Sequence, residues 1–232
     1  MPGFHDAEFG EITVQKRRGS KNVRIKVGVD GRLVATAPPY TPLLFSKQVI
    51  NSSRAQLREL TAHPTLQSHY NDGQAIGKSH TLAVVPTSMV REPTTKIERG
   101  TLIVYLPPGT SLESADVQQR VRETVITILR KEAKAQLPAR LSSLAAQHGF
   151  RYSKLRFSHA SGRWGSCTSE GTISLNIALM KLPDELSHYV LIHELCHTRH
   201  MNHSAAFWQE VERYDPHFRL HKRQIKRQTP SV

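Results

Sequence analysis

Alternating apolar and polar positions run through the first hundred residues, which is the pattern of half-buried strands. Asp30-Gly31 is a strong signal for a hairpin turn between two of these strands. Residues 46–60 interrupt the alternation with helical spacing, so the pattern suggests two similar units, each with strands followed by a helix. The expected strands span residues 11–15, 22–27, 32–37, 74–76, 81–85, 95–98 and 101–106.

Helical spacing takes over after residues 107–109, Pro-Pro-Gly. Apolar residues recur on one face of a long helix, which we expect to run to about Leu137. Pro138 should break this helix and start a shorter one that ends at Gly149. The pattern therefore predicts an α+β fold, with a β-rich N-terminal region over residues 1–109 and a second region over residues 110–232.

The second region continues with two expected strands, at residues 154–158 and 172–177. A glycine-punctuated turn at residues 162–167 lies between them. A helix with Pro183 in its first turn follows, and Ser204 can cap a last helix that runs to about Arg213. The remaining tail is basic, and we expect it to be frayed.

The helix that follows Pro183 carries the clearest chemistry. Residues 190–197, Val-Leu-Ile-His-Glu-Leu-Cys-His, contain His-Glu-x-x-His. Residues four apart share a helix face, so His193 and His197 can direct two imidazole nitrogens at one metal ion. Glu194 lies about 100° around the helix and can hold a metal-bound water without binding the metal itself. This arrangement is the signature of zinc hydrolases.

A catalytic zinc site has a third protein ligand and one open position. His200 lies seven residues after His193, about 10 Å along a continuous helix. That is too far for ligands that each lie ~2.1 Å from one zinc ion. The helix must therefore end and the chain must return, and Asn202 tolerates the turn that this needs. We expect His203 to be the third ligand, and the alternatives are Glu210, Glu212 and His217.

Composition indicates which partners and which cellular compartment to expect. The 232 residues carry a formal net charge of +13, which favours an acidic partner such as nucleic acid, a nucleotide or an anionic surface, although a solvated basic surface explains it equally well. No apolar run approaches the ~20 residues that span a bilayer, and the N-terminus lacks the features of a signal peptide. We expect a cytoplasmic protein with no membrane partner, whose Cys167 and Cys196 form no disulfide.

Four segments of the second region form a distinctive set: Arg163-Trp-Gly-Ser-Cys167, Ile173-Ser-Leu-Asn176, residues 189–197 and Asn202-His-Ser-Ala-Ala-Phe-Trp208. Together they resemble the YgjP-like metallopeptidases, which are related to the WLM and SprT-like zinc proteases. Residues 30–34 and 70–73 are also similar to that family. The resemblance implies Zn²⁺ on His193, His197 and His203, with Glu194 as catalytic base. It also implies a zincin-like core, which we place in residues 110–232.

These observations predict a zinc metallopeptidase that hydrolyses peptide bonds in a protein or peptide substrate. Zinc lowers the pKa of its bound water toward ~7, and Glu194 would accept the proton and pass it to the leaving group. Candidates for contacting the substrate or stabilising the oxyanion are Arg163, Tyr189 and His217. The strand at residues 172–177 precedes the zinc helix closely and could present its edge to an extended peptide.

Two other functions stay open on the sequence. A metal-dependent hydrolase of nucleotide phosphoanhydrides would use the same centre and would clamp phosphates with basic residues. The absence of a glycine-rich phosphate loop counts against it. A non-enzymatic, basic nucleic-acid-binding protein would use zinc as a structural ion and would need a fourth ligand, for which Cys167 is the obvious candidate.

Overall fold

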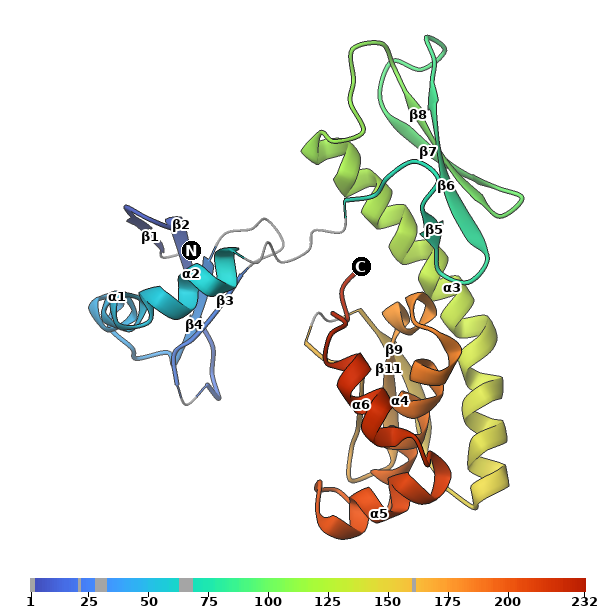
Figure 1. Cartoon of the computed structure of the whole chain (residues 1–232). Helices are drawn as coiled ribbons and strands as arrows, with labels where there is room; N and C mark the ends of the chain where they lie inside the picture. The colour runs from blue at the N-terminus through green and yellow to red at the C-terminus, as the bar shows by residue number, and fades with distance from the viewer. Residues whose placement is uncertain (1–2, 21, 28–32, 63–68, 160–161) are drawn as a thin grey trace. The chain divides into compact units, whose positions relative to one another are not determined.

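The computed structural model describes residues 3–20, 22–27, 33–62, 69–159 and 162–232 (Figure 1). It confirms a mixed α+β fold, and the chain forms two compact units, Met1–Ser68 and His69–Val232. The turn expected at Asp30-Gly31 lies outside the described residues. None of the helices in the described ranges combines the length and apolar character that crossing a membrane requires.

The first unit is a four-stranded sheet packed against two helices. Its strands are β1 (Gly3–Asp6), β2 (Gly10–Lys16), β3 (Arg24–Val27) and β4 (Leu33–Ala37), in the order β1-β2-β4-β3 with β2 and β4 parallel. The helices are α1 (Leu43–Ser52) and α2 (Arg54–Ala62). Ile12 and Leu33 of the sheet are buried with Ile50 and Leu57 of the helices.

The prediction of a single helix over residues 46–60 is wrong, because the helical conformation is interrupted at Ser53 between α1 and α2. Ser53 has a φ of −109° and a ψ of 12°, which lies outside the helical range. The neighbouring Ser52 donates its hydroxyl to the carbonyl of Val49 at 3.0 Å. Side chains that bond to nearby backbone in this way compete with helical pairing, and they favour an interruption here.

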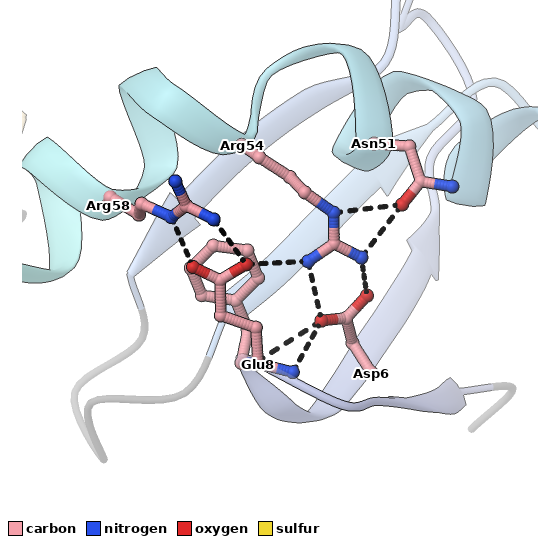
Figure 2. Close-up of polar contacts among 6 residues, drawn as sticks. Asp6, Glu8, Asn51, Arg54 and Arg58 are labelled. Carbon is pink, nitrogen blue, oxygen red and sulfur yellow. Dashed lines mark hydrogen bonds and ion pairs between the residues drawn. The ribbon is translucent and has the colours of Figure 1, made fainter.

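An ion-pair network joins the β1–β2 turn to α2 (Figure 2). The guanidinium of Arg54 binds the Asp6 carboxylate at 2.8 Å and the Glu8 carboxylate at 2.8 Å, and it also donates to Asn51. Arg58 pairs with the other oxygen of Glu8. Because Asp6 is only 9% exposed, its two hydrogen bonds from one guanidinium hold the turn firmly against the helix.

The second unit begins with a sheet that repeats the topology of the first. Its strands are β5 (Ala75–Ile76), β6 (His80–Pro86), β7 (Thr94–Glu98) and β8 (Thr101–Leu106). Their order is β5-β6-β8-β7, and the central pair is again parallel. All four strands were expected from the alternating pattern. The two sheets therefore share one topology, a repeat that the sequence pattern alone is too vague to establish.

This second sheet belongs with the C-terminal part of the chain. Leu82 and Leu102 share one core with Val121 and Val125 of α3 (Ala115–His148). The boundary between compact units consequently lies between Ser68 and His69, whereas the sequence pattern divides the chain after residue 109. The hydrophobic pattern shows where strands give way to helices, but it contains no information about which helix a sheet packs against.

α3 is one helix of 34 residues that runs past both sheets of the second unit (Figure 1). The expected break at Pro138 is wrong. Proline removes the hydrogen bond to the carbonyl of Lys134, but Lys134 is exposed, so water can satisfy that carbonyl. Leu137 and Leu141 on either side are fully buried, and their packing outweighs the lost bond. Gly149 caps the helix with a φ of 68°, as predicted.

A three-stranded sheet follows, with β9 (Lys154–Ser158), β10 (Gly165–Cys167) and β11 (Thr172–Asn176) in the order β10-β11-β9. The segment 162–167, expected to be only a turn, contains the edge strand β10. β11 pairs on both sides, so the prediction that it offers an open edge is wrong. Within the described residues, the open edges of this sheet belong to β10 and β9.

The remaining elements are helical: η1 (Ile177–Lys181, a 3₁₀ helix), α4 (Asp184–Cys196), α5 (Ala205–Tyr214) and α6 (Phe218–Ile225). Ser204 caps α5 by accepting from the backbone N–H of Phe207, as predicted. α6 was not expected, because its segment reads as a basic tail. Phe218 is 4% exposed and anchors α6 in the core, while Arg219 and Arg223 are exposed.

A buried carboxylate connects α3 to the start of α4. Glu132 is 5% exposed and accepts hydrogen bonds from the backbone N–H groups of Lys78 and Ser79. The ammonium of Lys78 donates to the carbonyl of Leu182 and pairs with Asp184, both at 2.7 Å. This chain of contacts fixes the N-terminus of α4 relative to α3, and α4 carries the His-Glu-x-x-His motif.

Candidate metal centre

Three imidazoles converge at the C-terminal end of α4. The Nε2 atom of His193 lies 3.2 Å from the Nε2 atoms of both His197 and His203. One ligand atom from each of the three residues lies within 4.8 Å of the other two. Nitrogens bound to one tetrahedral zinc ion at ~2.05 Å are about 3.3 Å apart. The three predicted ligands are therefore brought together with the spacing that one such ion requires.

The turn after α4 brings His203 back and orients His197. α4 ends at Cys196, and the backbone N–H of His200 bonds to the Cys196 carbonyl. The Nδ1 atom of His197 lies 2.9 Å from the His200 carbonyl, which can only accept, so Nδ1 carries the proton. The Nε2 atom of His197 is then left with a lone pair that faces the other two imidazoles. This is the tautomer that a metal ligand needs.

Aromatic rings on α5 hold the ligands in place. Phe207 stacks on His197, with ring centroids 4.5 Å apart and an interplanar angle of 27°. Trp208 stacks on His203 at 5.4 Å and 20°. His203 lies on an exposed turn, so the indole provides the packing that keeps its ring in register with the two helical ligands.

Glu194 is buried against β10. It is 4% exposed, and its Oε2 atom has no hydrogen-bond partner among the described residues. Burial raises the pKa of Glu194 to about 8, and the nearby charge of Arg163 opposes that rise. A Cβ atom at Gly165 would lie 2.5 Å from Oε1, so the backbone of β10 sits directly against the carboxylate. A divalent cation on the histidines would favour the ionised form.

Two of the candidate ligands, His193 and His197, are kept neutral by the same environment. Burial lowers the pKa of His193 to about 3, with further contributions from His197 and His203. Burial also lowers the pKa of His197. Because a metal ion binds imidazole only in its neutral form, these shifts favour metal binding near neutral pH. The donor set of three neutral nitrogens suits zinc.

The alternative ligands lie elsewhere. Glu210 pairs with Arg199 and with Nε2 of His200 at 2.8 Å, and Glu212 pairs with Arg219 at 3.0 Å. His217 is exposed and precedes α6, and Cys167 donates to the carbonyl of Thr168. Burial raises the pKa of Cys167 to about 11, and Glu194 adds to that rise. In the described part of the chain, the three histidines have no fourth protein ligand beside them.

The three candidates for substrate contact are placed differently. Tyr189 is 5% exposed, and its ring centroid lies 5.9 Å from that of His193 and 6.2 Å from that of His221. Burial raises the pKa of Tyr189 to about 12, so its hydroxyl stays protonated. Arg163 is exposed and precedes β10, where its charge acts on Glu194. Among the described residues, no ring contact joins His217 to the three ligands; its ring faces His221 at 6.3 Å.

Two residues near the centre were missed because α6 was read as a frayed tail. His221 pairs with the buried Asp215 at 2.7 Å and lies beside Tyr189. Lys222 places its ammonium 3.5 Å from the centroid of the Trp208 ring. The helical spacing of Phe218, Lys222 and Ile225, at i, i+4 and i+7, is the signal that could have revealed this helix.

Asn176 and Asn202 shape the backbone around the candidate metal centre. Asn176 is fully buried; its amide donates to the carbonyl of Arg163 at 3.0 Å, and its Oδ1 accepts from Ala178. It ties the end of β11 to the segment that leads into β10. Asn202 accepts from the backbone N–H of Ser204 at 3.3 Å and shapes the turn before α5.

Comparison with known proteins places the chain in a family. The family model described as YgjP-like, metallopeptidase domain, matches residues 21–228. No curated protein matches the chain. Among solved structures, the metallopeptidase zymogen of Pyrococcus abyssi abylysin is 28% identical over 37% of this chain and 87% of its own, with a TM-score of 0.34. Because the family model covers nearly the whole sequence, the chain belongs to the YgjP-like metallopeptidase family.

Proposed function

We propose that this protein is a zinc-dependent peptidase with a zincin-like catalytic core, in which Glu194 acts as the catalytic base. The observation that carries the proposal is the convergence of three imidazole nitrogens, with Nε2 of His193 3.2 Å from Nε2 of His197 and of His203, beside a buried carboxylate oxygen that has no partner among the described residues. His193, His197 and His203 would hold the zinc ion. When bound, zinc would supply a Lewis acid and lower the pKa of a water molecule toward ~7.

Glu194 would take the proton from that water through Oε2 and deliver it to the leaving amine. Burial raises the pKa of this carboxyl, which helps it to hold a transferred proton near neutral pH. A divalent cation on the histidines would favour the ionised form that accepts the proton in the first step. Tyr189 retains its proton and lies beside His193, so it is the better placed of the candidates to donate to a developing oxyanion. Arg163 would act from the β10 side.

The substrate would lie along β10. This strand pairs only with β11 among the described residues, and the backbone of Gly165 touches the Glu194 side chain. An extended peptide that adds to the open edge of β10 would therefore bring its backbone next to the catalytic base. The sequence suggested residues 172–177 as the strand whose edge binds an extended peptide; we assign this role to residues 165–167 instead.

A structural zinc site is less well supported, because no fourth ligand closes the centre within the described residues. The experiment compares the zinc-loaded protein with Glu194→Gln on an unfolded casein-like protein and on nucleoside triphosphates. We expect cleavage of the protein substrate that falls at least ~100-fold in the variant, with zinc content unchanged. Hydrolysis of the triphosphates alone, or cleavage that survives the substitution, would reject the proposal.

A further inference from the structure

An ammonium group lies beside the metal centre on a helix that the proposed reaction does not use. Nζ of Lys222 is 3.5 Å from the centroid of the Trp208 ring, and the same ring stacks on His203 at 5.4 Å. The ammonium is therefore at most about 9 Å from the centroid of the His203 ring, comparable with the Debye length of about 8 Å at physiological ionic strength. Its charge reaches the metal centre without full screening.

Lys222 has no acidic partner in the part of the chain that the structure describes. The two carboxylates closest to it in sequence are engaged elsewhere, because Asp215 pairs with His221 at 2.7 Å and Glu212 pairs with Arg219 at 3.0 Å. Burial, and then the charge of Lys226, lower the pKa of Lys222. An unpaired cation in a partly buried position is ready to receive an anion.

The surroundings of the centre contain a second cation and one free carboxylate. The charge of Arg163 acts on Glu194 from the β10 side. Another acidic group on α5 near the histidines, Glu210, pairs with Arg199 and contacts Nε2 of His200. The three histidines therefore have Arg163 and Lys222 as nearby cations, and the proposed reaction uses Glu194 for proton transfer. A substrate with negative charge near the scissile bond would complement this field.

We propose that Lys222, held on the indole of Trp208, forms an anion-binding subsite that takes a carboxylate side chain of the peptide substrate near the scissile bond. The inference rests on the proposed peptidase function and names its substrate class. The cation–π contact restrains the ammonium before substrate arrives, so less side-chain entropy is lost when the ion pair forms. Lys222 is a specificity-determining residue in this scheme and takes no part in proton transfer.

The test uses pairs of peptides that differ only by Asp or Asn at each position flanking the scissile bond. With the zinc-loaded full chain at low ionic strength, we expect kcat/KM to favour Asp by about 5-fold to 10-fold at one position. Lys222→Met should abolish the preference and Lys222→Arg should preserve it. Arg223→Met is the matched control, because Arg223 is exposed on the next position of α6, and it should leave the preference intact.

A binding readout separates this inference from the peptidase proposal. The Kd values of the same peptides and of a nucleoside triphosphate are measured by calorimetry on Glu194→Gln with and without Lys222→Met. If no peptide is cleaved but Lys222→Met removes the Asp preference in binding, the subsite is upheld and the peptidase proposal fails. If peptides are cleaved with the same Asp-to-Asn ratio in wild type and Lys222→Met, the subsite is refuted and the peptidase stands. If Lys222→Met weakens only nucleoside triphosphate binding, the occupant is a phosphate and the inference is overturned.

Discussion

Gly165→Ala tests the contact between β10 and the Glu194 carboxylate, the proposed catalytic base. The added Cβ atom would lie 2.5 Å from Oε1 of Glu194 and 2.7 Å from its Cγ, whereas ordinary contacts begin at 3.4 Å. Glu194 is 4% exposed, so its side chain has little room to yield, and we expect a displacement of about 1 Å. A misplacement of about 1 Å at a catalytic group can lower the rate about 100-fold.

The assay measures kcat and KM on a peptide substrate together with zinc content. We expect kcat to fall about 100-fold, zinc content to stay at the wild-type value, and the free energy of unfolding to fall by about 1–3 kcal/mol from overpacking. Gly162→Ala is the control, because its Cβ atom would meet nothing within 4 Å, and it should behave as wild type. A Gly165→Ala enzyme with kcat within about threefold of wild type would refute the proposed contact.

Three further predictions concern the carboxylates and the ligand turn. In metal-free protein, burial raises the pKa of Glu194 from its ordinary value of 4.5 to about 8, so the wild type loses stability as pH rises through this window. Glu194→Gln removes that loss, so its free energy of unfolding in urea should exceed that of wild type by on the order of 3–5 kcal/mol above pH 8 but not at pH 4.5. A difference that does not vary with pH would contradict the assigned burial. Glu132→Ala leaves the backbone N–H groups of Lys78 and Ser79 without their acceptor and should lower the free energy of unfolding by about 3–5 kcal/mol. The control Glu123→Ala, at an exposed position of the same helix, should lower it by less than about 0.5 kcal/mol. Equal losses would show that the network is not stabilising. Glu210 contacts His200, whose carbonyl orients His197, so Glu210→Gln should loosen this turn and weaken zinc affinity about 10-fold to 100-fold in a chelator competition. An unchanged affinity would show that the turn keeps its conformation without Glu210.

The parts of the site that sequence could predict are those set by local geometry. His193, Glu194 and His197 follow from helical spacing, which is the same in any protein. Ligand distance excludes His200 and favours His203 as the third ligand, although it left Glu210, Glu212 and His217 as alternatives. Both arguments use only the neighbouring chain and the dimensions of a helix, and the structure brings the three histidines together as expected.

The parts that sequence could not predict depend on contacts between distant segments. Nothing local to Gly165 shows that its backbone touches Glu194, so β10 reads as a turn. Pro138 predicts a helix end from its own chemistry, and the burial of Leu137 that overrides it is a tertiary effect. α6 carries mostly basic residues, and only its packing through Phe218 shows that Lys222 belongs beside the metal centre.

The most direct test of the metal centre is zinc K-edge X-ray absorption on protein loaded with one equivalent of zinc. The account predicts three nitrogen ligands and one light-atom ligand from solvent, all at about 2.0–2.1 Å. The same measurement on His203→Ala should lose one imidazole, and His200→Ala should match wild type because His200 pairs with Glu210. A sulfur ligand, a fourth imidazole, or an unchanged spectrum in His203→Ala would contradict the proposed catalytic centre.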